Sequence, residues 1–234
     1  MYRVGNHKFI KEGFNCSRAT VLGNPFSLSH FAGDRNKVIR KHKELLHKIL
    51  TCVNKKAYDN LFLYACEQYS KGTRYEFLQE LGNALQHPSK TFLCWCKPEA
   101  CHCDNYLEFT NSFRLTVSGS RSIKDRGFIF DQLDRICEPM TKVDKTRYLI
   151  GGESPFGVDS VLKDYANTRD WIYVPIPAEW NNYGKRAGML RNIVMINLSS
   201  HFIAIWDGKS KGTEQAIKEA RKRNIDCRVL TYKR

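Results

Sequence analysis

The feature of this sequence that most constrains its fold is a series of four glycine-bearing loops in the second half of the chain. Each loop follows a short apolar run and leads toward a helical pattern. The loops are Ser118-Gly119-Ser120-Arg121, Gly151-Gly152-Glu153-Ser154, residues 177–188, and Asp207-Gly208-Lys209-Ser210-Lys211-Gly212-Thr213. Strand–loop–helix units stack into a parallel sheet whose loops gather at the carboxyl edge, where such sheets bind ligands. Glycine lets backbone N–H groups approach a phosphate, so the loops predict a phosphate or nucleotide site.

From residue 113 onward, strand and helix patterns alternate along the chain. Strands are expected at 114–118, 147–150, 171–176, 202–206 and 227–230, and helices at 127–138, 158–167, 186–198 and 213–223. Strands in this order pair in parallel, with helices on both faces of the sheet. We therefore expect an α/β, Rossmann-like nucleotide-binding domain over residues 113–234.

Residues 1–112 have a different pattern and are expected to form a smaller, mainly α, cysteine-rich α/β domain. Apolar residues recur at roughly helical spacing over 36–51, 57–69 and 74–85, and residues 91–96 are expected to form a short strand. A proline-bearing turn follows, and a short helix is expected from Glu99. The start of the chain, up to about residue 35, is irregular and contains several glycines.

The composition indicates which cellular compartment and which kinds of binding partner to expect. The net charge is +14, which indicates either a solvated basic surface or an anionic partner such as a nucleotide or nucleic acid. No apolar run approaches the length of a membrane span, and the N-terminus lacks the apolar core of a secretory signal. The nine cysteines are more typical of reduced thiols or metal ligands than of a disulfide scaffold. We expect a cytoplasmic protein with no membrane partner, and self-association stays open.

Candidate nucleotide contacts come from all four loops and from the helix starts beside them. They are Gly119, Ser120, Arg121, Gly151, Gly152, Trp180, Lys185, Arg186, Arg191, Asp207, Ser210, Gly212 and Thr213. An arginine fork suits a phosphate, a helix start with a Thr hydroxyl faces an anion, and Trp180 could stack on a base. Taken singly, each residue also has a structural interpretation, such as a glycine turn, a core tryptophan or a surface ion pair.

The order and spacing of these motifs resemble the SLOG superfamily, the Rossmann-like fold of the SMF/DprA and LOG proteins, and specifically its YspA/YpsA-like branch. The resemblance covers roughly the last 120 residues. It includes the Ser118 and Gly151 loops, Gly157-Val158-Asp159, residues 180–188, Arg191-Asn192 with Met195, and Trp206 through Thr213. It implies a pocket for a nucleoside phosphate or a nucleotide-derived, ADP-ribose-like signal. The protein would then act as a sensor, sponge or carrier of that ligand.

The resemblance leaves the chemistry open. LOG-type proteins resemble phosphoribohydrolases in which a Glu follows the Gly-Thr motif by two or three residues, but those positions here are Gln215 and Ala216. Glu214 lies one residue before the first of those positions, which turns its side chain by about 100° around a helix. Glu214 and Asp159 are the two acidic candidates for catalysis. This departure favours binding without cleavage. The alternatives are a nucleotide N-glycosidase or related transferase, which would be an enzyme, and a DNA-binding protein of the DprA type.

A second cluster of reactive side chains lies near the end of the first domain. The candidate zinc ligands are Cys94, Cys96, Cys101, His102 and Cys103. A reactive thiolate beside His102 and a set of buried, inert thiols are the two other interpretations. Together with Gly23-Asn24-Pro25-Phe26, the cluster resembles a domain of unknown function from bacterial and phage proteins, which supplies no activity. If the protein is phage-encoded, the host cytoplasm is its expected location.

Overall fold

In the computed structural model the chain folds as two compact units, Met1–Asn111 and Ser112–Arg234. The structure describes residues 1–17, 20–52, 73–140 and 145–232. The helix expected at 57–69 lies outside the described residues.

The second unit contains a five-stranded parallel sheet. Its strands are β4 (Phe113–Gly119), β5 (Arg147–Gly151), β6 (Ile172–Pro175), β7 (His201–Trp206) and β8 (Asp226–Thr231). Their order across the sheet is β6-β5-β4-β7-β8, and every neighbouring pair is parallel. The chain runs outward from β4 to β6 and then returns to the other side of β4. The strand order therefore reverses between β4 and β7.

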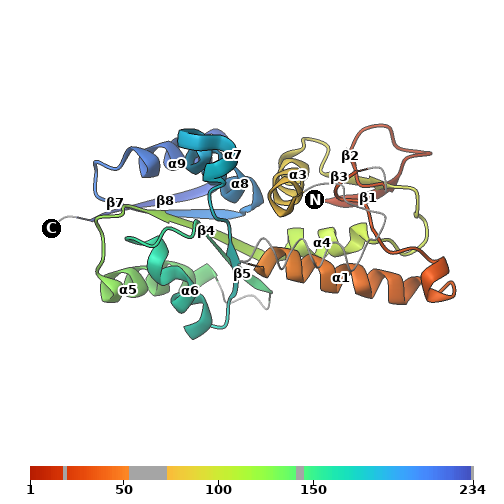
Figure 1. The fold of residues 1–234 in the computed structure, drawn as a ribbon, viewed down its shortest axis with the longest axis horizontal. Coiled ribbons are helices and arrows are strands. Elements are labelled where there is room, and N and C mark those ends of the chain that lie inside the picture. The colour runs from red at the N-terminus through yellow and green to blue at the C-terminus, as the bar shows by residue number, and fades with distance from the viewer. Residues whose placement is uncertain (18–19, 53–72, 141–144, 233–234) are drawn as a thin grey trace. The chain divides into compact units, whose positions relative to one another are not determined.

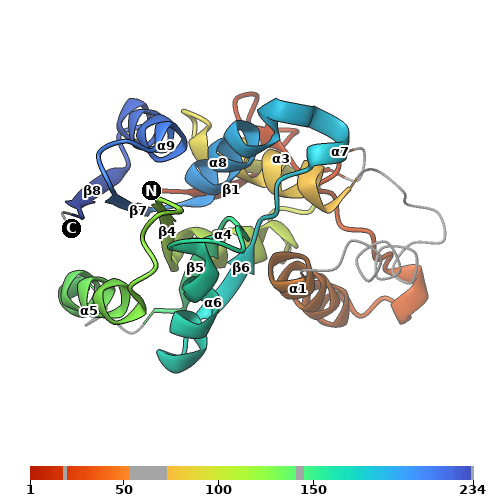
Figure 2. The ribbon, with the colours of Figure 1, turned by 60° about the vertical axis from the view of Figure 1, so that its left-hand side comes forward.

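Helices cover both faces of this sheet, as the alternating pattern predicts. The helices α5 (Arg126–Cys137) and α6 (Asp159–Thr168) lie on one face, and α8 (Ala187–Leu198) and α9 (Lys211–Lys222) on the other (Figure 1). Figure 2 shows the same two layers from a second direction. Strand β7 serves both cores, because Ile203 and Ile205 pack with α5 and α6 while Phe202 and Ala204 pack with α8 and α9. The Rossmann-like α/β class is confirmed.

The helix starts of this unit differ in how they are capped. At α5 the Asp125 side chain accepts a hydrogen bond from the Phe128 N–H at 2.9 Å. At α9 the preceding residue, Ser210, makes no such bond to the first turn. A short helix, α7 (Trp180–Tyr183), and a 3₁₀ turn (Gly184–Arg186) precede α8, and another 3₁₀ turn (Glu138–Met140) follows α5. The start of α9 thus keeps backbone N–H groups available to a ligand.

The first unit is also an α/β fold. A three-stranded parallel sheet has the order β1-β3-β2, with β1 at Arg3–Asn6, β2 at Phe14–Asn15 and β3 at Thr91–Cys94. Its helices are α1 (Arg35–Thr51), α3 (Arg74–Gln86) and α4 (Cys103–Asn111), with a 3₁₀ turn at Ser29–Phe31. Asp34 caps α1, and Thr73 forms a capping box with Glu76 at α3. The smaller, mainly helical unit is as expected, although β1 and β2 were not predicted.

Two boundaries near the cysteines differ from the sequence-based expectation. The strand expected to reach residue 96 ends at Cys94, and the helix expected from Glu99 begins at Cys103. The Asp104 carboxylate accepts a hydrogen bond from the Cys101 N–H at 2.9 Å and pairs with Lys97. These bonds hold residues 95–102 as a loop. Within the described residues, no helix is both long and apolar enough to cross a bilayer.

Candidate functional site

A cavity of about 390 Å³ opens at the carboxyl edge of the second unit's sheet, where the strand order reverses between β4 and β7. Segments following β4, β5 and β7 form its walls, together with the start of α8. The lining residues are Ser118, Gly119, Arg121, Ser122, Ser154, Asp159, Arg191, Asn192, Asp207, Ser210, Gly212 and Thr213. Parallel strands bring their carboxyl ends to one edge, so loops distant in sequence meet there.

A glycine at the end of β4 sets the shape of this edge. A Cβ at Gly119 would overlap the Val158 side chain and lie 3.0 Å from the Ile205 carbonyl oxygen. Only glycine therefore lets the start of α6 approach the end of β4 so closely. This contact places Asp159, the first residue of α6, at the pocket wall.

The loop before α9 is shaped by Asp207. Its Oδ1 accepts hydrogen bonds from the N–H groups of Lys209 at 2.9 Å and Ser210 at 2.8 Å, and its Oδ2 accepts one from the Ser122 hydroxyl at 2.6 Å. The Ser122 bond, followed by these backbone bonds, holds the pKa of the Asp207 carboxyl well below its usual range. Ser120 is buried, and its hydroxyl accepts from the Asp207 N–H at 3.1 Å. Asp207 and Ser120 thus build the loop that presents Ser210 and α9.

A nearly buried pair of opposite charges forms the opposite wall. The Arg191 guanidinium donates to the Gly152 carbonyl through Nη1 and to the Asn192 side chain through Nε at 2.9 Å. Its Nη1 lies 3.8 Å from Asp159 Oδ2, and the two side chains are 12% and 11% exposed. Burial raises the pKa of the Asp159 carboxyl, although the charge of Arg191 opposes the shift. Hydrogen bonds therefore hold the Arg191 cation in place in the pocket, beside the Asp159 carboxyl, which keeps its proton more readily than an exposed carboxyl does.

Several predicted contacts lie away from the cavity lining. Trp180 is 53% exposed in α7, and Lys185 and Arg186 are exposed in the turn that follows. Gly151 ends β5 against the Tyr173 ring, and Gly152 lies behind Arg191 and Asp159, which line the pocket. Glu214 projects from the outer side of α9 and pairs with Lys218 at 2.5 Å. Of the two acidic candidates for catalysis, Asp159 is the one that lines the pocket.

Sequence reasoning missed four lining residues, namely Ser118, Ser122, Ser154 and Asn192. Three of them are next to a predicted contact and Ser154 is two residues from Gly152, so position in the loop was the available signal. Asn192 donates weakly to the Gly212 carbonyl at 3.5 Å and to Gln215 Oε1 at 3.4 Å. Among the described residues, the Gln215 side-chain nitrogen is the one fully buried side-chain polar atom with no hydrogen-bond partner. A polar layer thus continues beneath the pocket floor into α9.

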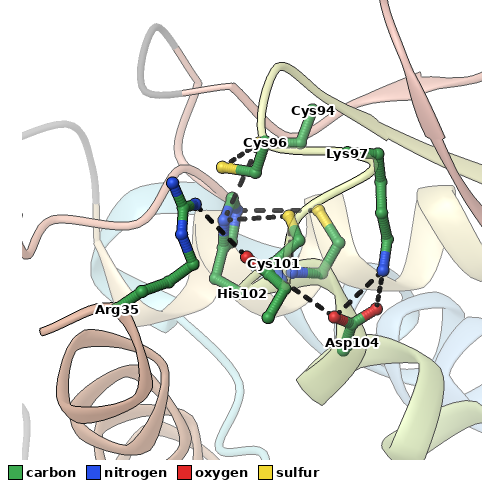
Figure 3. A network of polar contacts seen from close by, with 9 residues as sticks. Arg35, Cys94, Cys96, Lys97, Cys101, His102 and Asp104 are labelled. Atoms are coloured by element: carbon green, nitrogen blue, oxygen red, sulfur yellow. Dashed lines mark hydrogen bonds and ion pairs between the residues drawn. The ribbon is translucent and has the colours of Figure 1, made fainter.

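The first unit contains a buried cluster of three thiols and one imidazole. The ligand atoms of Cys94, Cys101, His102 and Cys103 lie within 4.8 Å of one another. His102 Nε2 is 3.0 Å from the Cys16 carbonyl oxygen, so this nitrogen carries the proton and donates. His102 Nδ1 is then free to act as a ligand, and it lies 3.8 Å from the Cys94 sulfur and 3.7 Å from the Cys101 sulfur (Figure 3).

These separations fit a tetrahedral metal site. Zinc bonds of about 2.3 Å to sulfur and 2.0–2.1 Å to nitrogen place such ligands about 3.6 Å apart. A ligand histidine normally donates its other ring N–H to a carbonyl or carboxylate, as His102 does to Cys16. The cluster could therefore hold a metal such as zinc. Cys96, also a candidate ligand, lies outside this group of four, with its sulfur 3.5 Å from that of Cys94.

Thiol–imidazole contacts also shift the proton equilibria of the cluster. Burial lowers the pKa of His102, but hydrogen bonds and charge from Cys101 and Cys94 outweigh burial and raise the pKa to about 10, so a metal that binds Nδ1 must displace a proton from it. A hydrogen bond from Cys103 contributes most to lowering the pKa of the Cys101 thiol to about 6. Thiolate is the form that binds metals, so the environment of Cys101 favours the state that a metal requires.

Comparison with known proteins gives a match for each unit. Residues 2–112 match the family described as "Domain of unknown function (DUF4326)", and residues 113–183 match the "YspA, cpYpsA-related SLOG family". The chain is 30% identical over 118 residues to the "Gene 61 protein" of Mycobacterium phage D29, an alignment that covers 48% of this chain and 91% of the phage protein. No solved structure gives a significant match. Both resemblances inferred from the motifs are confirmed.

Proposed function

Because the chain belongs to the DUF4326 family through its N-terminal unit and to the YspA, cpYpsA-related SLOG family through its C-terminal unit, we propose that the C-terminal pocket binds a nucleoside phosphate or an ADP-ribose-like, nucleotide-derived signal. The protein would then act as a sensor, sponge or carrier. The observation that carries the proposal is the cavity between β4 and β7, which joins Arg191 to the uncapped start of α9.

The phosphate end of the ligand lies against α9 in this proposal. Ser210, Gly212 and Thr213 line the pocket at the helix start, and the Thr213 hydroxyl is 3.1 Å from the Ser210 hydroxyl. Free N–H groups and the helix dipole favour negative charge at this position. Arg121, from the loop after β4, lines the same cavity and adds a second cation. A phosphate receives charge-assisted hydrogen bonds from such a set.

The remainder of the ligand lies toward Asp159 and Asn192. Both line the cavity and offer groups that hydrogen-bond to ribose hydroxyls or to the edge of a base. A cavity of about 390 Å³ falls in the range of small-molecule sites and admits a nucleoside monophosphate. Asp207 is committed to its own loop through its bonds to Lys209, Ser210 and Ser122, so Asp159 is the carboxyl left to contact a ligand.

The position of Asp159 also supports a second candidate function, hydrolysis or transfer at a nucleotide N-glycosidic bond. A general acid or base works best when its pKa lies near the working pH, and burial raises the pKa of Asp159 in that direction. Glu214 lacks this placement, since it pairs with Lys218 away from the pocket. The binding function remains the first proposal, because the chain has Gln215 and Ala216 at the positions where the LOG-type proteins that its motifs resemble carry Glu.

Calorimetry tests the binding proposal. AMP, ADP and ADP-ribose should bind at least tenfold more tightly than adenosine, because most of the implied contacts are to phosphate. Arg191→Ala should weaken nucleotide binding by about ten- to a hundredfold, since a charge-assisted contact contributes about 1.5–3 kcal/mol. Arg126→Ala is the matched control, because Arg126, at the start of α5, pairs with Asp164 of α6 and does not line the pocket. Equal affinity for adenosine and AMP would reject the phosphate site.

A separate assay decides between binding and cleavage. The protein is incubated with a panel of nucleoside monophosphates, and released base is measured by chromatography. Base release that disappears in Asp159→Asn would establish the enzymatic alternative. Tight nucleotide binding with no base released from any member of the panel would favour the sensor, sponge or carrier role.

A further inference from the structure

Two sequence motifs of the N-terminal unit meet at a cavity that the nucleotide proposal does not use. The cavity has a volume of about 230 Å³. The Gly-Asn-Pro-Phe segment contributes Asn24 and Phe26 to its lining, and the cysteine segment contributes Cys94, Trp95, Cys96 and His102. Helix α1 closes a third side. Motifs far apart in the sequence thus come together at one hollow beside the Cys₃His cluster.

Most of the cavity wall is apolar. Phe26 and Leu28 approach from the segment before α1, and Val38 and Ile39 from α1 itself. Val38 is buried, whereas Leu28 is 36% exposed and stands at the rim. A wall of this kind favours the apolar body of a small ligand.

One buried residue in the cavity lining has a donor that lacks a partner. Asn24 is 7% exposed, and its Oδ1 accepts a hydrogen bond from the Phe26 N–H at 3.0 Å. This bond fixes the orientation of the amide, so the two N–H donors of Nδ2 are the atoms left over. Within the described residues Nδ2 has no hydrogen-bond partner. Nδ2 is not among the fully buried atoms and Asn24 lines the cavity, so a ligand there that supplies an acceptor can take this donor.

A positively charged side chain, that of Arg35, lines the same cavity. Arg35 is the first residue of α1 and lines the cavity, and its Nη1 donates to the Ala100 carbonyl at a long 3.4 Å. Figure 3 shows its side chain extending from α1, and His102 lines the same cavity. Over the part of the chain that the structure describes, Arg35 forms no ion pair with an acidic side chain. Its guanidinium can therefore pair with an acidic ligand.

We propose that this cavity binds a small organic acid with an apolar body. The carboxylate pairs with Arg35 and accepts from Asn24 Nδ2, while the apolar part lies against Phe26, Val38 and Ile39. One arginine and one amide match a monoanionic, bidentate carboxylate. The described lining of this cavity includes one arginine, whereas the nucleotide pocket of the C-terminal unit is lined by two, Arg121 and Arg191, which distinguishes the two sites.

The test uses ¹⁹F NMR of the full chain with two probes of equal size, 4-fluorobenzoate and its uncharged analogue 4-fluorobenzamide. Wild-type protein should bind the acid at least tenfold more tightly than the amide. Arg35→Gln should reduce that preference to less than threefold. Arg40→Gln, at an exposed position of the same helix outside the cavity, should keep it. Equal binding of the two probes, or an unchanged preference in Arg35→Gln, would overturn the proposal.

Two further variants locate the probe. Leu28→Trp places a larger side chain at the half-exposed rim and should abolish binding of the acid while the protein keeps its melting temperature. Arg191→Ala alters only the C-terminal pocket and should leave binding unchanged. Loss of acid binding in Arg191→Ala, with binding retained in Leu28→Trp, would place the probe in the nucleotide pocket and reject the N-terminal site.

Discussion

Replacing Gly152 with alanine is a sharp test of how the nucleotide pocket is organised. A Cβ at this position would overlap the Arg191 guanidinium, with Cζ at 2.5 Å, and would lie 2.7 Å from Asp159 Oδ2. Both are the ends of side chains, and no backbone atom is among these nearest contacts. The methyl group should therefore displace Arg191 from the Gly152 carbonyl and from Asp159 without unfolding the sheet.

The expected loss can be estimated from these contacts. If Arg191 reaches the phosphate, displacing it removes at least one charge-assisted hydrogen bond, worth about 1.5–3 kcal/mol. Nucleotide affinity should then fall by about ten- to a hundredfold. The stability cost should stay below about 1.5 kcal/mol, because flexible side chains can move aside. Calorimetry with AMP and a thermal melt measure the two effects separately.

Gly127→Ala is the control for this experiment. Gly127 lies in α5, outside the pocket, and its added Cβ would make an ordinary 3.6 Å contact with Asp125 Oδ1. This variant should bind AMP as wild type does. If Gly152→Ala also binds with wild-type affinity, Arg191 does not contact the ligand and our assignment of the phosphate site is wrong. A collapse of the Gly152→Ala fold would instead mean that Arg191 and Asp159 cannot move aside.

The remaining predictions concern stability and metal content. Asp159→Asn should raise the melting temperature at pH 7. The raised pKa of Asp159 means that keeping this carboxyl ionised in the folded chain costs free energy. The cost is about 1.4 kcal/mol for each tenfold change in the acid dissociation constant of Asp159. The folded chain binds this proton more tightly than the unfolded one, so the gain should shrink as the pH falls through the folded-state pKa toward 3.8; a gain that grows in acid would contradict the assignment. Elemental analysis should find about one zinc per chain, lost in Cys101→Ser and retained in Cys52→Ser, whose thiol lies outside the cluster. Gln215→Met should stabilise the chain by about 1 kcal/mol in denaturant titration, since it removes a buried amide nitrogen that has no partner among the described residues. A loss of that size would show that the Asn192 bond to Gln215 Oε1 outweighs this gain.

The alternation of strands and helices from residue 113 onward was readable from the sequence, because each element has its own local hydrophobic period. Parallel pairing then followed, since βαβ connections bring successive strands side by side in one direction. For the same reason the loops of Gly119, Asp159 and Ser210 could be expected at one edge of the sheet. In the first unit, β1 (RVGN) and β2 (FN) escaped prediction because each contains a single large apolar residue, which is too little to form a pattern.

Only the tertiary structure decided which side chains face the pocket. Asp159 and Glu214 are equally acidic in the sequence, yet Asp159 lines the cavity and Glu214 pairs with Lys218 outside it. Trp180 stands exposed in α7, although the sequence allowed it over the ligand. Side-chain direction depends on the rotation of each helix against the sheet, which a local pattern does not record.

The same division holds for the cysteine cluster. The sequence named five candidate ligands by their proximity along the chain, and the fold brought four of them together. Which nitrogen of His102 is free for a metal depends on the Cys16 carbonyl, which lies 86 positions away in the sequence. The meeting of Asn24, Arg35 and the cysteine loop at one cavity is likewise a long-range outcome. The sequence by itself determined which elements form and which residue types they carry, because these depend on near neighbours; the tertiary structure decided which of those residues meet, because that depends on packing between distant segments.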